Sequence, residues 1–298
     1  MTAPGMAPER GSMRDRAASA AVFVPLLLLA FAVGRPTIAL IVVLGIVIGT
    51  WESYRLLRSA GYPALEVVGV IVAVAFAVDA VLPSGVALPA GLTPTGITAM
   101  GPLLLGIAVV VVGVASFTRA EPHEGLAAWI ATLFGAVYVG QLGFVARLSN
   151  DAIALPGGAS LAFVGTERAW VLLLVFGVWA YDTGAFLVGR RIGGPRFLTH
   201  LSPSKTYAGL VGGTLACIVV VALMLAGIGR DPAEALIVGP LLGWTAQAGD
   251  LAESMLKRAA GAKDSGGLIP GHGGVLDRID SFLFAAPALA LYVRLVVA

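Results

Sequence analysis

The chain has 298 residues, of which 58% are hydrophobic and 12% charged, and its formal net charge is +2. Because the apolar residues fall into blocks too long for half-buried helices, the composition indicates an all-α polytopic membrane protein rather than a soluble domain. The small net charge and the lack of a polybasic run give nucleic-acid binding no support.

Nine apolar blocks are predicted to cross a membrane as helices. Their approximate limits, in chain order, are 17–33, 37–50, 65–82, 103–117, 127–146, 169–187, 208–227, 233–248 and 281–297. The second and fourth blocks are short for a hydrocarbon core of about 30 Å. We expect an N-terminal scaffold of residues 1–168, which the Pro/Gly-rich stretch at 83–102 can split into two subdomains. A catalytic membrane domain of residues 169–298 follows.

The positive residues set the expected orientation, because Lys and Arg near span ends are preferentially kept in the cytoplasm. With the N-terminus inside, fourteen of the nineteen lie on the inner side. The other five lie outside or in the last span: Arg35, Arg147, Arg168, Arg230 and Arg294. We therefore expect a cytoplasmic N-terminus and an outer C-terminus in the cell's inner membrane. Residues 30–32 formally resemble a signal-peptidase site, but we expect no cleavage.

A polar stripe follows the eighth apolar block. In GDLAESMLKR, Asp250, Glu253, Ser254 and Lys257 stand at offsets 0, 3, 4 and 7, which places them on one face of a helix. Such a stripe can line a site, or it can be a solvated helix face.

Two further carboxylates precede the ninth block. Asp277 and Asp280 are spaced i, i+3 and can converge if that turn is helical. Together with Asp250 they give three carboxylates near one membrane surface, a ligand set that suits Mg²⁺. Zinc is a poorer fit, because His272 has no companion Cys or His at ligand spacing and Cys217 lies in a span.

Glycine-rich and hydroxyl-rich stretches precede the seventh and ninth blocks, where a helix N-terminus favours bound anions. Gly271, Gly273 and Gly274 would let the backbone approach a phosphate closely, and His272 can face it or be structural. Upstream, LSPSKTYAGLVGG offers hydroxyls and a cation in Ser202, Ser204, Lys205 and Thr206. The alternative for this second stretch is an ordinary capped helix start.

These residues resemble the signature of the phosphatidate cytidylyltransferases, also called CDP-diacylglycerol synthases. The matching positions are Ser254, Leu256, Lys257, Arg258, Lys263, Asp264, Gly266, Ile269, Pro270, His272, Gly273, Gly274, Val275, Asp277, Arg278, Ile279 and Asp280. YDTGAFLVGRRIG at 181–193 and SPSKTYAGLVGG at 202–213 are similar to two more family blocks. The resemblance covers about 130 residues, and the N-terminal half is similar only in having several apolar spans. Tyr207 and Ala208 depart from the family's usual Trp followed by Glu or Gln.

The resemblance implies that CTP and phosphatidate react to CDP-diacylglycerol and pyrophosphate, with Mg²⁺, at the cytoplasmic face. It also implies catalytic roles for Asp250, Lys257, Asp277 and Asp280, with the three aspartates holding the metal and a second, monovalent cation such as K⁺ allowed beside it. Substrate contacts are expected from Ser202, Lys205, Thr206, Ser254, Arg258, Lys263, His272, Gly273, Gly274 and Arg278. Asp182 in the sixth span is costly in lipid, so we expect it to face the bundle interior near this site. Family members tend to form homodimers.

Two other functions remain open at this point. A secondary transporter would also place glycine-broken, polar helix ends inside a bundle, but it needs a path to the outer face, where charges are sparse. A CDP-alcohol phosphotransferase also arrays aspartates on helices for a metal, but its signature spacing does not fit residues 250–280.

Overall fold

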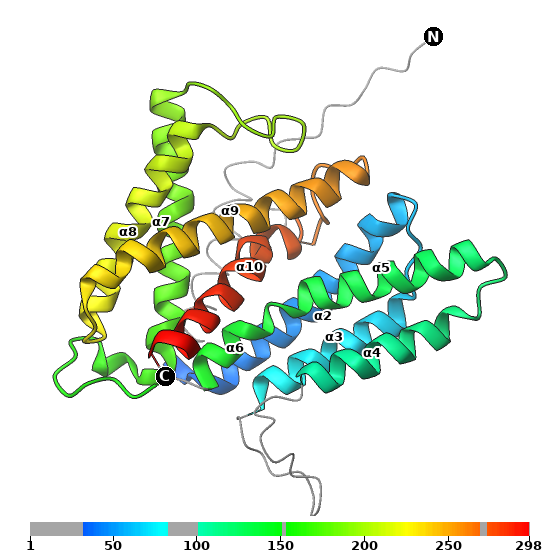
Figure 1. Ribbon diagram of the computed structural model, residues 1–298, viewed down its shortest axis with the longest axis horizontal. Helices are drawn as coiled ribbons and strands as arrows, with labels where there is room; N and C mark the ends of the chain where they lie inside the picture. The colour runs from blue at the N-terminus through cyan, green and yellow to red at the C-terminus, as the bar shows by residue number, and fades with distance from the viewer. Residues whose placement is uncertain (1–31, 83–100, 151–152, 269–272, 298) are drawn as a thin grey trace, which may run out of the picture.

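In the computed structural model, which describes residues 32–82, 101–150, 153–268 and 273–297, those residues form helices and loops and no extended strand (Figure 1). The α-helices are α2 (Arg35–Ser59), α3 (Glu66–Val81), α4 (Gly101–Ser116), α5 (Pro122–Gly140), α6 (Gly143–Asn150), α7 (Thr166–Ile192), α8 (Tyr207–Gly227), α9 (Ala235–Ala259) and α10 (Leu276–Tyr292). Short 3₁₀ turns lie at Ala162–Val164 and Pro232–Glu234, and a π-helical turn, Val293–Val297, continues α10. The predicted all-α class is confirmed.

Five segments of the described residues are long and apolar enough to cross a membrane. They are Arg35–Ser59, Pro122–Asn150, Thr166–Ile192, Tyr207–Gly227 and Leu276–Val297. These are the segments of a multi-pass membrane protein. The nine predicted spans are not confirmed, because the blocks at 65–82 and 103–117 form helices of only 16 residues, and all but the end of the block at 17–33 lies outside the described residues.

Several helices extend beyond the limits predicted for the apolar spans, because an apolar block ends where charge begins and a helix need not. The block predicted to end at 50 continues as α2 to Ser59, and the one predicted to end at 248 continues as α9 to Ala259. α10 begins at Leu276 instead of 281. The block at 127–146 is two helices, α5 and α6, separated at Gln141 and Leu142.

α10 joins the two hydrophobic cores of the molecule. In Figure 1, α2 to α5 lie side by side, α7 and α8 form a steep pair, and α10 lies between α9 and α2. Leu276 and Leu283 of α10 belong to the core of α2, α3 and α5, whereas Ala286 and Leu289 belong to the core of α7, α8 and α9. α10 is therefore packed from both sides. The division at 168/169 stays a prediction.

Missing side chains let α7 and α8 approach closely. A Cβ atom at Gly184 would stand 2.9 Å from the carbonyl oxygen of Gly212, and one at Gly213 would stand 2.7 Å from that of Tyr181. Small residues are the usual means by which helices pack in lipid, where no hydrophobic force drives them together.

The opposite side of α8 carries an exposed apolar stripe with helical spacing. Val211, Leu215, Val219 and Leu223 are 58–68% exposed. A stripe of this kind would be costly in water and is suited to contact with lipid tails.

Candidate active site

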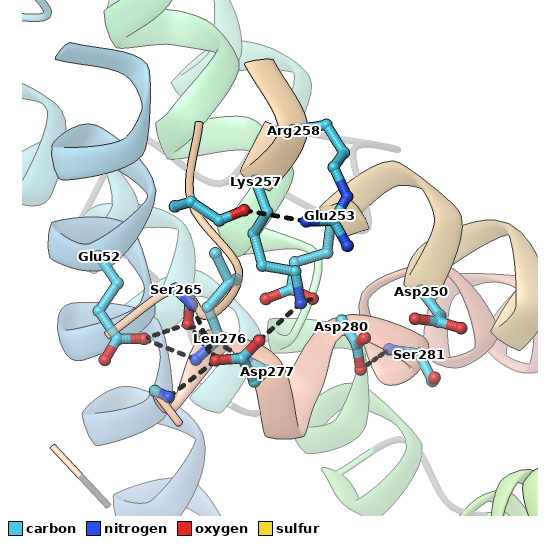
Figure 2. A network of polar contacts seen from close by, with 12 residues as sticks. Glu52, Asp250, Glu253, Lys257, Arg258, Ser265, Leu276, Asp277, Asp280 and Ser281 are labelled. Carbon is cyan, nitrogen blue, oxygen red and sulfur yellow. Dashed lines mark hydrogen bonds and ion pairs between the residues drawn. The ribbon is translucent and has the colours of Figure 1, made fainter. Parts of the chain in front are cut away.

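The C-terminal ends of α2 and α9 and the N-terminal end of α10 meet, and polar side chains fill the space where they meet. Figure 2 shows these side chains in a row from Glu52 on α2 to Asp250 on α9. α9 ends in a Schellman turn, in which the amide of Ala262 donates to the carbonyl of Lys257 over 2.8 Å and Gly261 takes φ +64°. This turn directs residues 262–268 back towards α2.

The polar stripe on α9 is a lining and not a solvated face. Glu253 is fully buried and Ser254 is 8% exposed, whereas Met255 next to them is 54% exposed. The prediction that these residues share one helix is confirmed, and the alternative of a solvated face was wrong.

Lys257 lies at the centre of the row. Its Nζ atom is 2.5 Å from Glu253 Oε2 and 2.6 Å from Asp277 Oδ1. Among the described residues, Lys257 is the only cation paired with the buried Glu253 carboxylate. A buried carboxylate without such a partner is expensive, so this ammonium group compensates charge on both α9 and α10.

Asp277 fixes the loop before α10. Its Oδ2 atom accepts from the Ser265 amide at 2.9 Å, the Ser265 hydroxyl at 2.9 Å and the Gly274 amide at 2.8 Å, while Oδ1 accepts from Lys257. Gly273 has φ +79°, and a Cβ atom there would run into Asp277 Oδ2. Both oxygens of this predicted metal ligand therefore already accept hydrogen bonds.

Asp250 and Asp280 are brought together by Gly249. A Cβ atom at Gly249 would meet the backbone of Asp280 and Ser281, so α9 and α10 touch at this point. Asp280 Oδ1 accepts from the Ser281 amide at 2.7 Å, and the carboxylate interacts electrostatically with Asp250. Asp250 is ion-paired with Lys205 at the start of α8.

The donor set suits a hard cation, although the side chains as they stand do not form a complete shell. Within the described ranges, no three His, Cys, Asp or Glu side chains are grouped closely enough to hold a metal ion. The two lysines ion-paired here face an excess of carboxylates: Asp182, Asp250, Glu253, Asp277 and Asp280. Carboxylate oxygens are the ligands that Mg²⁺ prefers, and a divalent cation would offset the excess charge. The three-aspartate metal centre stays a prediction.

The loop before α8 reaches the same place. Lys205 contacts Asp250, and Arg258 Nε donates to the carbonyl of Leu201 over 3.3 Å, which places Ser202 beside the end of α9. The Thr206 hydroxyl accepts from the Gly209 amide at 3.1 Å, so Thr206 is the N-cap of α8. This agrees with the alternative prediction that the stretch is an ordinary capped helix start.

Other predicted residues lie at the edge of this group. Arg258, Lys263 and Arg278 are exposed, and His272 lies outside the described residues. Asp182 on α7 is also exposed, and that it faces the bundle interior stays a prediction. It still interacts electrostatically with Lys205 and Asp250 and borders the site.

One residue of the site was missed. Glu52 on α2 is 4% exposed, and its carboxylate accepts from the Leu276 amide at 2.8 Å and the Val275 amide at 3.2 Å. The Ser265 hydroxyl lies 3.2 Å from Glu52 Oε2 and can donate to it or to Asp277. The only signal in the sequence is a carboxylate two residues after the end of an apolar block. The place of the Glu52 side chain also explains why residue 274 is a glycine, because a Cβ atom there would collide with Glu52 and Ser265.

Residues 14–296 match the cytidylyltransferase family. The chain belongs to that family. Cytidylyltransferase-family similarity therefore extends through the N-terminal half, which we had expected to resemble the family only in its apolar spans. This range includes both Glu52 and the α9–α10 residues.

Several curated relatives in the cytidylyltransferase family are phosphatidate cytidylyltransferases. That of Brucella suis biovar 1 (strain 1330) is 44% identical over 125 residues, 41% of this chain and 46% of the relative. That of Synechocystis sp. (strain ATCC 27184 / PCC 6803 / Kazusa) is 40% identical over 194 residues, which cover 59% of this chain and 66% of the relative. The chloroplastic phosphatidate cytidylyltransferase 5 of Arabidopsis thaliana is 35% identical over 182 residues, which cover 55% of this chain and 45% of the relative. The chain thus spans about half the length of most of these relatives.

Proposed function

We propose that this protein transfers the cytidylyl group of CTP to phosphatidate, giving CDP-diacylglycerol and pyrophosphate. The observation that carries the proposal is the cluster in which Lys205, Asp250, Lys257, Asp277 and Asp280 come together from α8, α9 and α10. The names of the relatives supply the substrates. In the part of the chain that the structure describes, no feature favours a transporter or a CDP-alcohol phosphotransferase.

The chemistry needs charge neutralisation more than proton transfer. A phosphate monoester is already largely ionised near neutral pH, so its oxygen can attack the α-phosphorus of CTP without a general base. A new P–O bond forms, the bond to the β-phosphate breaks, and pyrophosphate leaves. Lys257 and Lys205 are placed to neutralise phosphate charge, with Arg258, Lys263 and Arg278 at the exposed rim.

Mg²⁺ is the cofactor that this donor set fits. Asp250 and Asp280 would hold it, with Asp277 as the third ligand predicted from the sequence. Bound there, it would withdraw charge from the phosphate oxygens. Lys257 donates to Asp277 Oδ1, so a metal bound at that oxygen would compete with Lys257, which would then be available to contact substrate phosphate. A second, monovalent cation such as K⁺ rests on the family resemblance alone.

The proposed location is the inner membrane, with the active site open to the cytoplasm, nine spans, the N-terminus inside and the C-terminus outside. Two observations support a single face for the chemistry. The ends of α2 and α9 and the start of α10 meet through Glu52, Lys257 and Asp277, and the start of α8 joins them through Lys205. The proposed partners are the two substrates, the lipid bilayer and a second copy in a homodimer.

Purified protein incubated with labelled CTP, phosphatidate and Mg²⁺ should form a labelled lipid that migrates as CDP-diacylglycerol. Pyrophosphate should appear in equal amount, and chelation of Mg²⁺ should stop both. Diacylglycerol in place of phosphatidate is the matched control and should give no product, because it lacks the attacking phosphate. Release of pyrophosphate without labelled lipid would contradict the assignment.

Sidedness can be measured at Leu268, which is 62% exposed at the end of the loop after α9. We expect Leu268→Cys, in a Cys217→Ala background, to resist an impermeant maleimide in intact cells and to react after permeabilisation. Cys217 is fully buried, so its removal should leave little background labelling. Labelling of Leu268→Cys in intact cells would place the active site on the outer face and reverse the topology.

A further inference from the structure

The N-terminus of α10 lacks a cap of its own. The first amides of a helix have no partner within the helix and are usually satisfied by a side chain just before it. Val275 occupies that position and has no side-chain acceptor. The Val275 and Leu276 amides donate to Glu52 instead, 3.2 Å to Oε1 and 2.8 Å to Oε2. The Asp277 amide donates to the Ser265 hydroxyl at 3.3 Å, so the cap of α10 is supplied mainly by Glu52 of α2 and in part by the loop after α9.

The position accepts a carboxylate and little else. Both Glu52 oxygens receive donors, whereas a glutamine side chain has one acceptor oxygen and would turn an NH₂ group towards another donor. Gly266 and Gly274 leave room for the side chain, since a Cβ atom on either would collide with it. Hydrogen bonds and the positive end of α10 compensate the charge of Glu52.

Glu52 is linked to the proposed catalytic lysine through two shared groups. The Ser265 hydroxyl lies 3.2 Å from Glu52 Oε2 and 2.9 Å from Asp277 Oδ2, and it has a single proton to offer the two carboxylates. Asp277 in turn accepts from Lys257 at 2.6 Å. Figure 2 shows the row from Glu52 through Ser265 and Asp277 to Lys257.

We propose that Glu52 is a positioning residue of the active site. It holds the loop before α10 against α2 and, through Ser265 and Asp277, sets the place of Lys257. The assignment rests on the proposed cytidylyl transfer for its kinetic consequence, but the capping itself does not. The N-terminal half would then contribute to catalysis as well as to the scaffold.

Kinetics of Glu52→Gln test the consequence. We expect kcat to fall at least about tenfold, the equivalent of roughly 1.4 kcal/mol in the barrier, with KM for phosphatidate within about twofold. Glu52→Asp, which keeps the charge, should recover part of kcat. Ser265→Ala should lower kcat less than Glu52→Gln does. In the variant that carries both changes, the fold-loss of kcat should be smaller than the product of the two single fold-losses, because both residues act through the same link to Asp277. Asp79→Asn is the matched control, since Asp79 pairs with Arg147 at 2.7 Å, away from this link, and it should leave kcat unchanged.

Hydrogen exchange in the full-length protein tests the capping without any activity. In Glu52→Gln, the Val275 and Leu276 amides should exchange about tenfold faster or more, as expected when a buried hydrogen bond to a charged group is lost, while α7 and α8 stay unchanged. If the wild-type protein makes no lipid product, the proposed function fails and this measurement still decides the capping. Unchanged exchange at 275–276, or Glu52→Gln with wild-type kcat, would overturn the inference. If Glu52→Gln does not fold, Ser265→Ala replaces it, and wild-type kcat in that variant would overturn the link to Asp277.

Discussion

Replacing Asp280 by Asn should lower turnover at least about a hundredfold, roughly 3 kcal/mol in the barrier, and Asp250→Asn should do the same. Each change removes one anionic ligand and keeps nearly the same volume, so packing should survive. The loss is large because charge stabilisation is the main catalytic contribution in transfer of phosphoryl-type groups. The measurement is Mg²⁺-dependent CDP-diacylglycerol formation by variants that elute as single species in detergent.

The double variant and a neighbouring aspartate provide the controls. Asp250→Asn combined with Asp280→Asn should be little worse than either alone, because residues serving one metal act as a unit. Asp264 is exposed and outside the proposed metal set, so Asp264→Asn should cost less. Near-normal activity of Asp280→Asn with an unchanged Mg²⁺ requirement would make this carboxylate a structural group of α10 and put the metal elsewhere.

Replacing Lys257 by Met should have the second large effect and should reduce both activity and stability. The change removes the cation paired with Glu253 and Asp277 and leaves the Glu253 carboxylate buried without a partner. Breaking a buried ion pair in this way costs about 3–5 kcal/mol of stability. We expect turnover to fall at least about a hundredfold, since the same ammonium group is assigned to phosphate charge.

A second substitution separates the two effects. Glu253→Gln added to Lys257→Met removes the stranded charge, so the thermal midpoint should return most of the way to that of the wild type. Activity should not return, because no cation has been restored. If the double variant regained both, Lys257 would be a structural partner of Glu253 and not a catalytic group. Thermal unfolding followed by size exclusion, beside the lipid assay, distinguishes these results.

Local spacing was enough to predict part of the site. The offsets 0, 3, 4 and 7 place Asp250, Glu253, Ser254 and Lys257 on one face, because helical periodicity depends only on neighbours along the chain. The structure confirms this shared face. It also shows that the turn at Asp277 is helical, which the i, i+3 spacing of Asp277 and Asp280 had only required as a condition for their convergence.

Long-range pairing was beyond the reach of spacing. The pattern grouped Asp250, Asp277 and Asp280 by charge, but it could not show that Lys257 and the loop amides already occupy Asp277. Glu52 was missed for the same reason, because a carboxylate after an apolar block looks like any span end. Several helices run past the predicted spans, because hydropathy reports transfer into lipid and does not mark where a helix ends.

The cap that α2 supplies to α10 has a consequence for how the protein is made. Glu52 and Ser265 are 213 positions apart in the chain, so α2 is synthesised long before the loop and helix that it completes. Closing so long a loop is entropically costly and slows folding. The contacts of Glu52 can therefore form only after the Ser265 loop and the start of α10 have been synthesised. A nascent chain stalled before residue 276 would hold Lys205, Asp250 and Lys257 but would lack Asp277, Asp280 and the helix end that Glu52 caps, so this polar group could not form.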